Sequence, residues 1–425
     1  MYRVREFVTT YAGLLIAGAC VALVWANLHP PSYHDFVEAV LVEDFVIGHA
    51  YEADDGVARR LTLRYLVNDV AMALFFAVMA KELWEALVLD RGALRGRKAA
   101  TPLVAAAGGM LAPAAVYLGL AALTGPDTYD VLAGGWAIPV ATDIALAYAV
   151  GRMVFGAGHP ALRFLLLLAI ADDAAALAIL AVAYPPAGLA PGWLLLSAGA
   201  GAGAFVLFNW LPRRLDRGKR MRPNSTRMRR RLGLWPYAAA GAASWFGVQQ
   251  AGLPPALGLL PVIPAIPHAD RAFGLFAEAE RYLSDLLNRA EALLRRPAGA
   301  ALFLFGLCNA GAEVSAIAAP TWLVLAGLVI GKPLGVTLFG WLAARVLRLG
   351  LPRGMRLSDL VILGCVAGVG FTVPLVIAGA AFSGGATLEA VDLQGAARLG
   401  TLFSLAAAPV ALAAARLMKV NRRPA

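Results

Sequence analysis

The sequence predicts an all-α polytopic membrane protein, and its composition, its apolar segments and its charge distribution each indicate this fold class. Hydrophobic residues make up 60% of the 425 residues, roughly 255 side chains, whereas charged residues make up only 15%. An ordinary globular chain carries about 25% charged residues, and a water-soluble fold could not enclose so much apolar surface. At about 20 residues per crossing, these apolar residues suffice for about 12 transmembrane helices.

Charged or turn-rich breaks divide the chain into about twelve apolar segments, each near the length that a bilayer requires. They begin near Tyr11, Leu66, Ala99, Val131, Ala161, Gly192, Leu232, Leu253, Pro297, Trp322, Leu360 and Leu399. The eighth is the least regular, because it is short and five prolines interrupt it between residues 254 and 267. We expect residues 1–425 to form a single integral membrane domain.

The net charge of +10 reflects membrane topology rather than nucleic-acid binding. Basic residues gather in the loops that follow even-numbered segments, above all in residues 213–231, and acidic residues gather in the opposite loops. By the positive-inside rule, both termini and the basic loop at 213–231 lie in the cytoplasm. Membrane lipid is therefore an expected partner and nucleic acid is not. The three cysteines lie far apart in apolar stretches, which favours neither a disulfide framework nor a zinc site.

Two loops carry patterns of their own. The external stretch at 32–60 is long and contains β-branched and aromatic residues, so it could form a hairpin used for subunit contact. The cytoplasmic segment at 268–296 has leucines at helical spacing, an acidic start and a basic end, which is typical of an amphipathic interfacial helix. A solvated connector is the alternative for both loops.

Four charged residues fall near the middle of apolar segments, namely Asp143, Asp172, Asp173 and Lys332. One ionised group at this depth costs roughly 2.5 to 3.5 kcal/mol, so these residues must be compensated by one another, by water or by an ion. Neighbours on a helix point about 100° apart, so one aspartate of the adjacent pair can face Lys332 while the other faces a water-filled path. The plain alternative for Lys332 is that it only balances a buried carboxylate.

The adjacent acids also suggest what the site does. Because Asp172 and Asp173 repel each other, ionisation of both at once is disfavoured. A carboxylate in this setting can hold a proton or a hard cation, but not both. That competition is the physical basis of cation/proton exchange.

Helix breakers occur beside the same charges. The fourth segment reads GGWAIPVATDIA around Thr142 and Asp143, and the eleventh reads GCVAGVGFTVP around Thr372. Two segments interrupted by glycine and proline at corresponding places in the two halves of a chain indicate discontinuous helices that cross near the bilayer midplane. Asp143 could then offset the positive ends of the half-helices.

In these stretches the chain resembles the bacterial NhaA-type sodium/proton antiporters. The resembling stretches, in family order over most of the chain, are VNDVAMALFF, GWAIPVATDIA, the step from Ala171 to Asp173, CNAG, GKPLG and GVGFT. The resemblance implies twelve helices with inverted-topology repeats and two discontinuous helices. It also implies an inner-membrane antiporter without a cofactor, which serves pH homeostasis, exports sodium or lithium for more than one proton, and forms a homodimer through the hairpin at 32–60.

The resemblance also implies roles for individual residues. Asp172 and Asp173 would bind sodium and protons in turn during alternating access, and Lys332 would pair with Asp172. The helix crossing and the ion pathway would contain Thr142, Asp143 and Thr372. Because ion binding would release Lys332 into an apolar setting, the lysine could itself lose a proton, which would make transport electrogenic.

The chain departs from the family pattern at three places, one of which is the usual GHAT start of helix 8, replaced by LPPA at residues 253–256. Where members usually have L-E-V-K-R-E-L, residues 81–87 read KELWEAL, so Glu82 is kept as a candidate for a pH-sensing funnel while its basic and acidic neighbours are replaced. The usual FTMS becomes FTVP at residues 371–374, which puts Pro374 in place of a serine. We expect an intact exchange core with altered pH regulation.

Other functions remain open at this stage. A cation channel or a sodium-coupled symporter would also need charge at mid-bilayer, and only the direction and ratio of sodium and proton movement distinguishes them. An intramembrane enzyme is less favoured, because the sequence contains neither the G-x-G-D motif of aspartyl cleavage nor the D-D-x-x-D motif of prenyl transfer.

Overall fold

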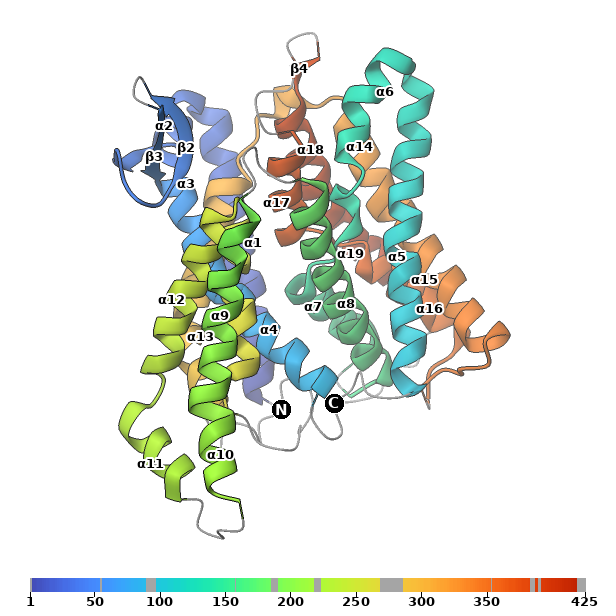
Figure 1. The fold of residues 1–425 in the computed structure, drawn as a ribbon. Helices are drawn as coiled ribbons and strands as arrows, with labels where there is room; N and C mark the ends of the chain where they lie inside the picture. Colours follow the sequence, from blue (N-terminus) through green and yellow to red (C-terminus); the bar gives the residue numbers. More distant parts are fainter. Residues whose placement is uncertain are drawn as a thin grey trace. The chain divides into compact units, whose positions relative to one another are not determined.

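A computed structural model of the chain describes residues 2–53, 56–88, 97–156, 158–184, 190–217, 223–267, 286–352, 354–382, 387–388 and 391–418. These residues are helical apart from loops and two small sheets (Figure 1). The chain forms two compact units. Unit 1 contains His34–Gly92 and Pro185–Phe305, and unit 2 contains Tyr2–Tyr33, Ala93–Tyr184 and Gly306–Ala425.

Unit 1 starts with a small antiparallel sheet within the segment where the sequence suggested a hairpin. Its strands are β1 (Val40–Val42), β2 (His49–Ala53) and β3 (Gly56–Thr62), with β3 in the centre. The sheet follows α2 (Pro30–Val37) and leads directly into a continuous helical run of α3 (Leu63–Tyr65), a π-helical turn (Leu66–Ala71) and α4 (Met72–Val88). Thr62 starts this run, because its hydroxyl accepts a 3.2 Å hydrogen bond from the backbone N–H of Tyr65.

The other elements of unit 1 are α9 (Leu194–Phe205), a π-helical turn (Val206–Trp210), α10 (Leu211–Leu215), α11 (Pro223–Leu232), α12 (Trp235–Gln250) and the first part of α13 (Leu286–Asn309). Residues 255–257 and 260–265 form 3₁₀ turns where the proline-rich eighth segment was the least regular. Serine hydroxyls link these parts: Ser197 and Ser244 lie 2.7 Å apart, and Ser244 donates to Gly258 O at 2.6 Å.

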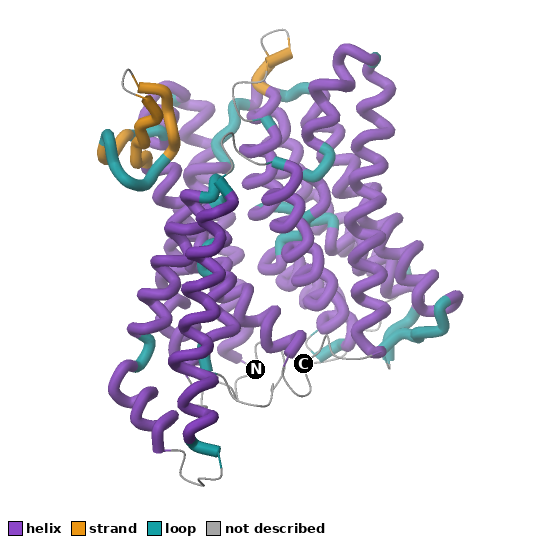
Figure 2. The backbone as a smooth tube through the Cα atoms, viewed as in Figure 1, coloured by secondary structure: helices purple, strands orange, loops and turns teal. Residues whose placement is uncertain are grey.

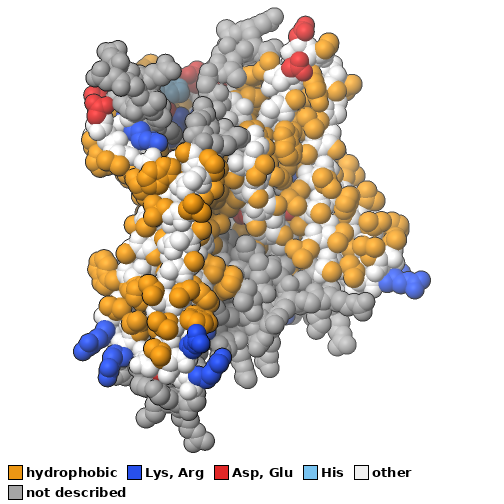
Figure 3. Space-filling model, viewed as in Figure 1, with side chains coloured by type: hydrophobic (Ala, Val, Ile, Leu, Met, Phe, Trp, Pro, Cys, Tyr) orange, Lys and Arg blue, Asp and Glu red, His pale blue; other side chains and the backbone are white. Residues whose placement is uncertain are grey.

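The surface of unit 1 separates charge from apolar side chains along the helices. Those basic side chains of α10 and α11 that the structure describes gather at one end of the helices of unit 1, and hydrophobic side chains cover the surface above them (Figure 3). Exposed apolar residues on α9 and the following turn include Leu195, Phe205 and Leu207. An apolar belt with a basic end is the surface expected of helices that cross a bilayer.

Unit 2 holds the remaining helices. They are α1 (Tyr2–Leu28), α5 (Arg97–Ala121), α6 (Pro126–Leu132), α7 (Ile144–Phe155), α8 (Pro160–Ala183), α14 (Ala319–Ala326), α15 (Lys332–Trp341), α16 (Leu357–Ala367), α17 (Thr372–Ala381), α18 (Leu393–Phe403) and α19 (Ala407–Leu417). A two-stranded sheet, β4 (Thr387–Leu388) and β5 (Val391–Asp392), precedes α18. In the core of unit 2, α7, α8 and α16 pack around Phe155, Phe164 and Leu363.

Helices α5 and α15 are in backbone contact. A Cβ atom added at Gly108 would collide with Gly335 O, and one added at Gly335 would collide with Gly108 O. At Gly331, a Cβ would lie 2.5 Å from the Cα of Pro113. Only glycine permits such an approach, as is common between membrane helices. The contact fixes the start of α15, and so Lys332, against α5.

Two helices of unit 2 are interrupted within the bundle. Between α6 and α7, 3₁₀ turns at Ala133–Gly135 and Ile138–Val140 end in extended backbone at Ala141, and helix resumes at Ile144. Between α16 and α17 the helix stops at Ala367 and resumes at Thr372, with a bend of 53°. Figure 2 shows short loop segments among the helices of unit 2.

Helix lengths confirm that the chain is a helical, multi-pass membrane protein. Within the described ranges, six helical stretches are long and apolar enough to cross a bilayer, and the bent pair α16 and α17 makes a seventh. Three shorter apolar helices also occur, Ala12–Leu28, Pro255–Ala265 and Pro297–Asn309. Each of the twelve apolar segments contains helical residues.

We predict that Gly108→Ala lowers the stability of the protein, because the added methyl group must push α15 away. Overpacking of this kind costs about 1 to 3 kcal/mol. Gly119→Ala is the matched control on the same helix, since no atom lies within 4 Å of its added Cβ. Thermal denaturation in detergent, followed by size-exclusion chromatography, should show a lower midpoint for Gly108→Ala only. Equal midpoints for the two variants would contradict the close contact.

Candidate ion-binding site

Lys332 lies at the first residue of α15, directly after a π-helical turn (Gly327–Gly331). Its side chain is 0% exposed. The ammonium Nζ donates three hydrogen bonds: to Val140 O at 2.5 Å, to Thr142 Oγ1 at 2.7 Å and to Asp172 Oδ2 at 2.6 Å. An ammonium group has three hydrogens, so all of its donors have acceptors. The charge is thus buried with an opposite charge and two neutral oxygens.

Asp172 lies in the middle of α8 and is also 0% exposed. Its Oδ2 accepts from Lys332 and lies 3.0 Å from the hydroxyl of Thr142. Its Oδ1 is buried without a hydrogen-bond partner among the described residues. One oxygen of this carboxylate therefore neutralises the lysine, and the other remains available to a ligand.

Asp173 differs from its neighbour in exposure and in its lack of an ion pair with Lys332 within the described part of the chain. It is partly exposed, its Oδ1 is buried without a partner, and it forms no hydrogen bond with any residue that the structure describes. The charges of Asp143 and Asp172 repel its own, while Lys332 attracts it. A carboxylate under such repulsion is stabilised by a bound proton or a bound cation.

Asp143 joins the two interrupted helices. Its Oδ1 accepts from Leu146 N at 2.8 Å, which caps α7, and its Oδ2 accepts from the backbone N and the hydroxyl of Thr372 at 3.2 and 3.0 Å, at the start of α17. The backbone N–H of Asp143 donates to Val369 O at 2.9 Å. One carboxylate thus offsets the positive N-terminal ends of two helices.

Thr142 connects the lysine to both interruptions. Besides accepting from Lys332, its hydroxyl lies 3.0 Å from Asp172 Oδ2 and 3.0 Å from Ala367 O, the last residue of α16. Its side chain is fully buried. Freed backbone and a polar side chain therefore meet at the point where the helices break.

The structure brings together all of the residues expected at the helix crossing, namely Thr142, Asp143, Asp172, Asp173, Lys332 and Thr372. Glu82 belongs to α4, but its side chain lies outside the described residues. Sequence reasoning missed the carbonyl of Val140, which no side-chain pattern could reveal. No group of three His, Cys, Asp or Glu side chains among the described residues has an arrangement that could hold a metal ion.

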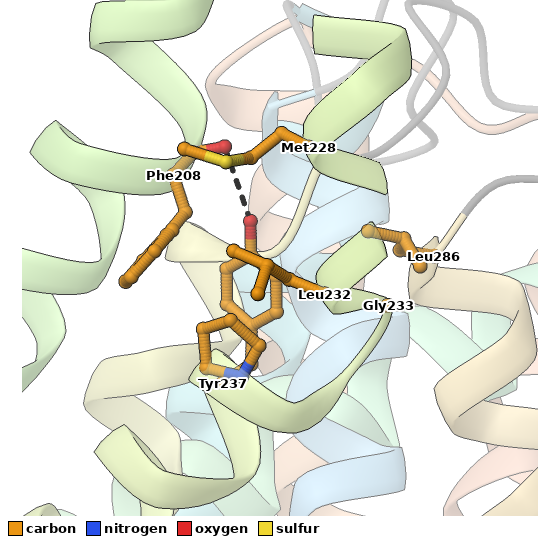
Figure 4. A pocket seen from close by; sticks show the side chains of 7 residues that line it. Phe208, Met228, Leu232, Gly233, Tyr237 and Leu286 are labelled. Atoms are coloured by element: carbon orange, nitrogen blue, oxygen red, sulfur yellow. Dashed lines mark hydrogen bonds between the residues drawn. The ribbon is translucent and has the colours of Figure 1, made fainter. Parts of the chain in front are cut away.

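A separate pocket in unit 1 lacks these features. It is lined by Phe208, Met228, Leu232, Gly233, Pro236, Tyr237 and Leu286 (Figure 4). Tyr237 Oη donates to Phe208 O at 3.3 Å. None of the lining residues carries a charged side chain.

Buried charges that balance one another inside interrupted helices of a multi-pass bundle are typical of one class of protein, the membrane ion transporters. Comparison with known proteins specifies the class further. The family profile described as Na+/H+ antiporter 1 matches residues 4–415. The chain belongs to this Na+/H+ antiporter family.

Individual relatives agree with the family. The Na(+)/H(+) antiporter NhaA of Jannaschia sp. (strain CCS1) is 59% identical over 424 residues, which is 100% of both chains. The Na(+)/H(+) antiporter NhaA of Geobacter sulfurreducens (strain ATCC 51573 / DSM 12127 / PCA) is 40% identical and covers 96% of each chain. A solved structure of the sodium proton antiporter MjNhaP1 from Methanocaldococcus jannaschii was also compared. The matched region covers 98% of this chain and 99% of that chain, with 16% sequence identity and a TM-score of 0.49. The family resemblance predicted from the sequence is confirmed by the profile and the first two relatives.

We predict that substitution of the two adjacent aspartates by asparagine has different effects on the stability of the protein. Asp172→Asn leaves the ammonium of Lys332 buried without a counter-charge and should destabilise the protein by about 3 to 5 kcal/mol. Asp173→Asn removes only repulsion and should leave stability equal or higher. The thermal midpoint in detergent measures both. The double variant Asp172→Asn with Lys332→Gln should recover most of the loss, and failure to recover would argue against a direct pair.

Proposed function

We propose that the chain is an electrogenic antiporter that exports sodium or lithium in exchange for protons by alternating access, with Asp172 and Asp173 as the ion-binding residues. The family makes sodium and protons the exchanged ions. The observation that carries the proposed site is the free carboxylate of Asp173 beside the Asp172–Lys332 pair. Together they offer the carboxylate of Asp173 and Oδ1 of Asp172, which are oxygen ligands of the kind that a hard cation prefers.

The exchange follows from competition at these oxygens. With the site open to the cytoplasm, a sodium ion binds Asp173 and the free Oδ1 of Asp172 as a proton leaves. The hydroxyl of Thr142 is a candidate third ligand, because it already lies 3.0 Å from Asp172. When the site opens outside, protons displace the ion. Transport in opposite directions needs no other energy source.

The proposed exchange is electrogenic. More than one proton enters for each sodium ion that leaves, so each cycle moves net charge across the membrane. A cation at Asp172 weakens the attraction between this carboxylate and the ammonium of Lys332, so ion binding acts directly on the buried pair.

We further propose twelve crossings with inverted-topology repeats, and both termini in the cytoplasm of a bacterium with the protein in its inner membrane. The support is the helical content of all twelve segments, the two interrupted helices that meet at Asp143, and the basic residues of 213–231. Movement of the repeat bundle around a fixed site would give alternating access. Glu82 stays a candidate for the pH-sensing funnel, and 268–296 for a cytoplasmic amphipathic segment of which only residues 286–296 are described.

A homodimer formed through residues 32–60 is part of the proposal. In the sheet of unit 1, β3 is central and β1 and β2 are its two edges. An edge strand presents backbone groups that can pair with another strand. A second copy of this sheet would supply such a strand.

We predict that the apparent KM for sodium rises as pH falls. Protons and sodium compete for the same oxygens, so each displaced proton should raise KM about tenfold per pH unit in the acidic limb. Sodium-dependent dequenching of a pH dye in everted vesicles, measured with sodium and with lithium between pH 6 and 9, gives the profile. A KM that does not change with pH would exclude a shared site.

Asp173→Asn is predicted to abolish sodium-driven proton movement in proteoliposomes, and Asp172→Asn with Asp173→Asn to do the same. Gly119→Ala is the control, since its added methyl contacts nothing within 4 Å. Sodium-driven proton flux that survives in the double variant would refute the assigned site. Sodium and proton movement in the same direction, or in no fixed ratio, would instead favour a symporter or a channel.

A further inference from the structure

At the interruption between α16 and α17, the backbone N–H and carbonyl of Gly370 lie outside both helices. Gly370 lies before Phe371, the residue at the N-terminal cap of α17. Hydrogen bonding into α17 begins with Leu375 N–H, which donates to Phe371 O, so the carbonyl of Gly370 lies one residue outside the helix and receives no donor from it. At bilayer depth water does not readily replace such a donor, so the carbonyl needs another partner.

Ser404 supplies that partner from a different helix. Its hydroxyl accepts from Gly370 N at 3.1 Å and donates to Gly370 O at 2.7 Å, so it can serve both polar groups of this residue. Ser404 is 0% exposed and follows the last residue of α18, at a 3₁₀ turn (Ser404–Ala406). Its hydroxyl also lies 2.6 Å from Thr401 O, but that carbonyl already receives the backbone N–H of Ser404.

The position of Ser404 is itself firmly held. Gly400, one turn earlier in α18, packs against α14, where an added Cβ would lie 2.5 Å from Thr321 O. The hydroxyl of Thr321 donates to Ala396 O at 2.8 Å. Because α14 leads through the π-helical turn to Lys332, the support for Gly370 comes from the same element that carries the buried lysine.

We propose that Ser404 is a positioning residue for the ion site, because its hydroxyl pairs with both the N–H and the carbonyl of Gly370 at the helix break and thereby holds the start of α17 against Asp143. The inference rests on the proposed function. Two residues after Gly370, Thr372 donates its backbone N–H and its hydroxyl to Asp143 Oδ2. Asp143 in turn repels the charge of Asp173. Ser404 therefore influences the ion-binding carboxylate through the peptide of Gly370.

The direction of the effect follows from geometry. Without the serine hydroxyl, the Gly370 peptide shifts toward other partners and the start of α17 moves away from Asp143. Asp143 then no longer joins the starts of α7 and α17, so the oxygens that bind sodium are less well aligned and the KM for sodium rises. A defect of folding alone would lower the maximal transport rate and leave KM unchanged.

Ser404→Ala is the test, with the sodium dependence of dequenching in everted vesicles at one alkaline pH as the readout. We expect the KM for sodium to rise about threefold or more, while the maximal rate per molecule in the membrane changes less. Thr401→Val is the matched control, because it removes a buried hydroxyl of the same helix that donates, among the described residues, to Ala397 O at 3.0 Å. It should leave KM unchanged.

A second variant separates the hydroxyl from the fold. Ser404→Cys keeps a weaker polar group at this position, so it should raise KM less than Ser404→Ala does, and it is the test if Ser404→Ala does not accumulate in the membrane. An unchanged KM in a well-expressed Ser404 variant would overturn the inference. Absence of sodium-driven flux in the unmodified protein would instead overturn the proposed function.

Discussion

The buried ammonium of Lys332 is the charge on which the rest of the site depends. It satisfies its three hydrogens with a carboxylate, a hydroxyl and the carbonyl of Val140. That carbonyl is available only because the helix ends there, so the interrupted helix and the lysine require each other. A continuous helix at this position would leave an ammonium hydrogen without a partner at a depth where such a group is costly.

Asp143 compensates the partial positive charge at the starts of the two interrupted helices. Each half-helix that begins inside a bilayer brings unpaired N–H groups and a partial positive charge. Here two such ends point at one carboxylate, which accepts hydrogen bonds from both. The remaining negative charge of the cluster, at Asp172 and Asp173, faces a single lysine. The site therefore has fewer fixed cations than acids, a deficit that a mobile cation or protons can fill.

The sequence alone predicted much of this arrangement, because charges and helix breakers are rare in apolar segments. Asp143, Asp172, Asp173 and Lys332 are conspicuous for the energy that they cost. The partners of these charges were less predictable, since Val140 contributes only its backbone and Ser404 is one small residue among many in an apolar helix. The small sheet before α3 was expected only as a hairpin, because the order of three short strands depends on backbone pairing rather than on side-chain pattern.

The hydroxyl of Thr142 has two acceptors, Asp172 Oδ2 and Ala367 O, at the same distance, but only one hydrogen to give. Rotation about a single bond takes that hydrogen from one acceptor to the other, and such a rotation is fast beside any helix movement. When the hydrogen points to Ala367, a lone pair of the oxygen turns toward the carboxylate pair. By this rotation Thr142 can present to the site either a hydrogen-bond donor or a lone pair. Its hydrogen is bonded in both orientations.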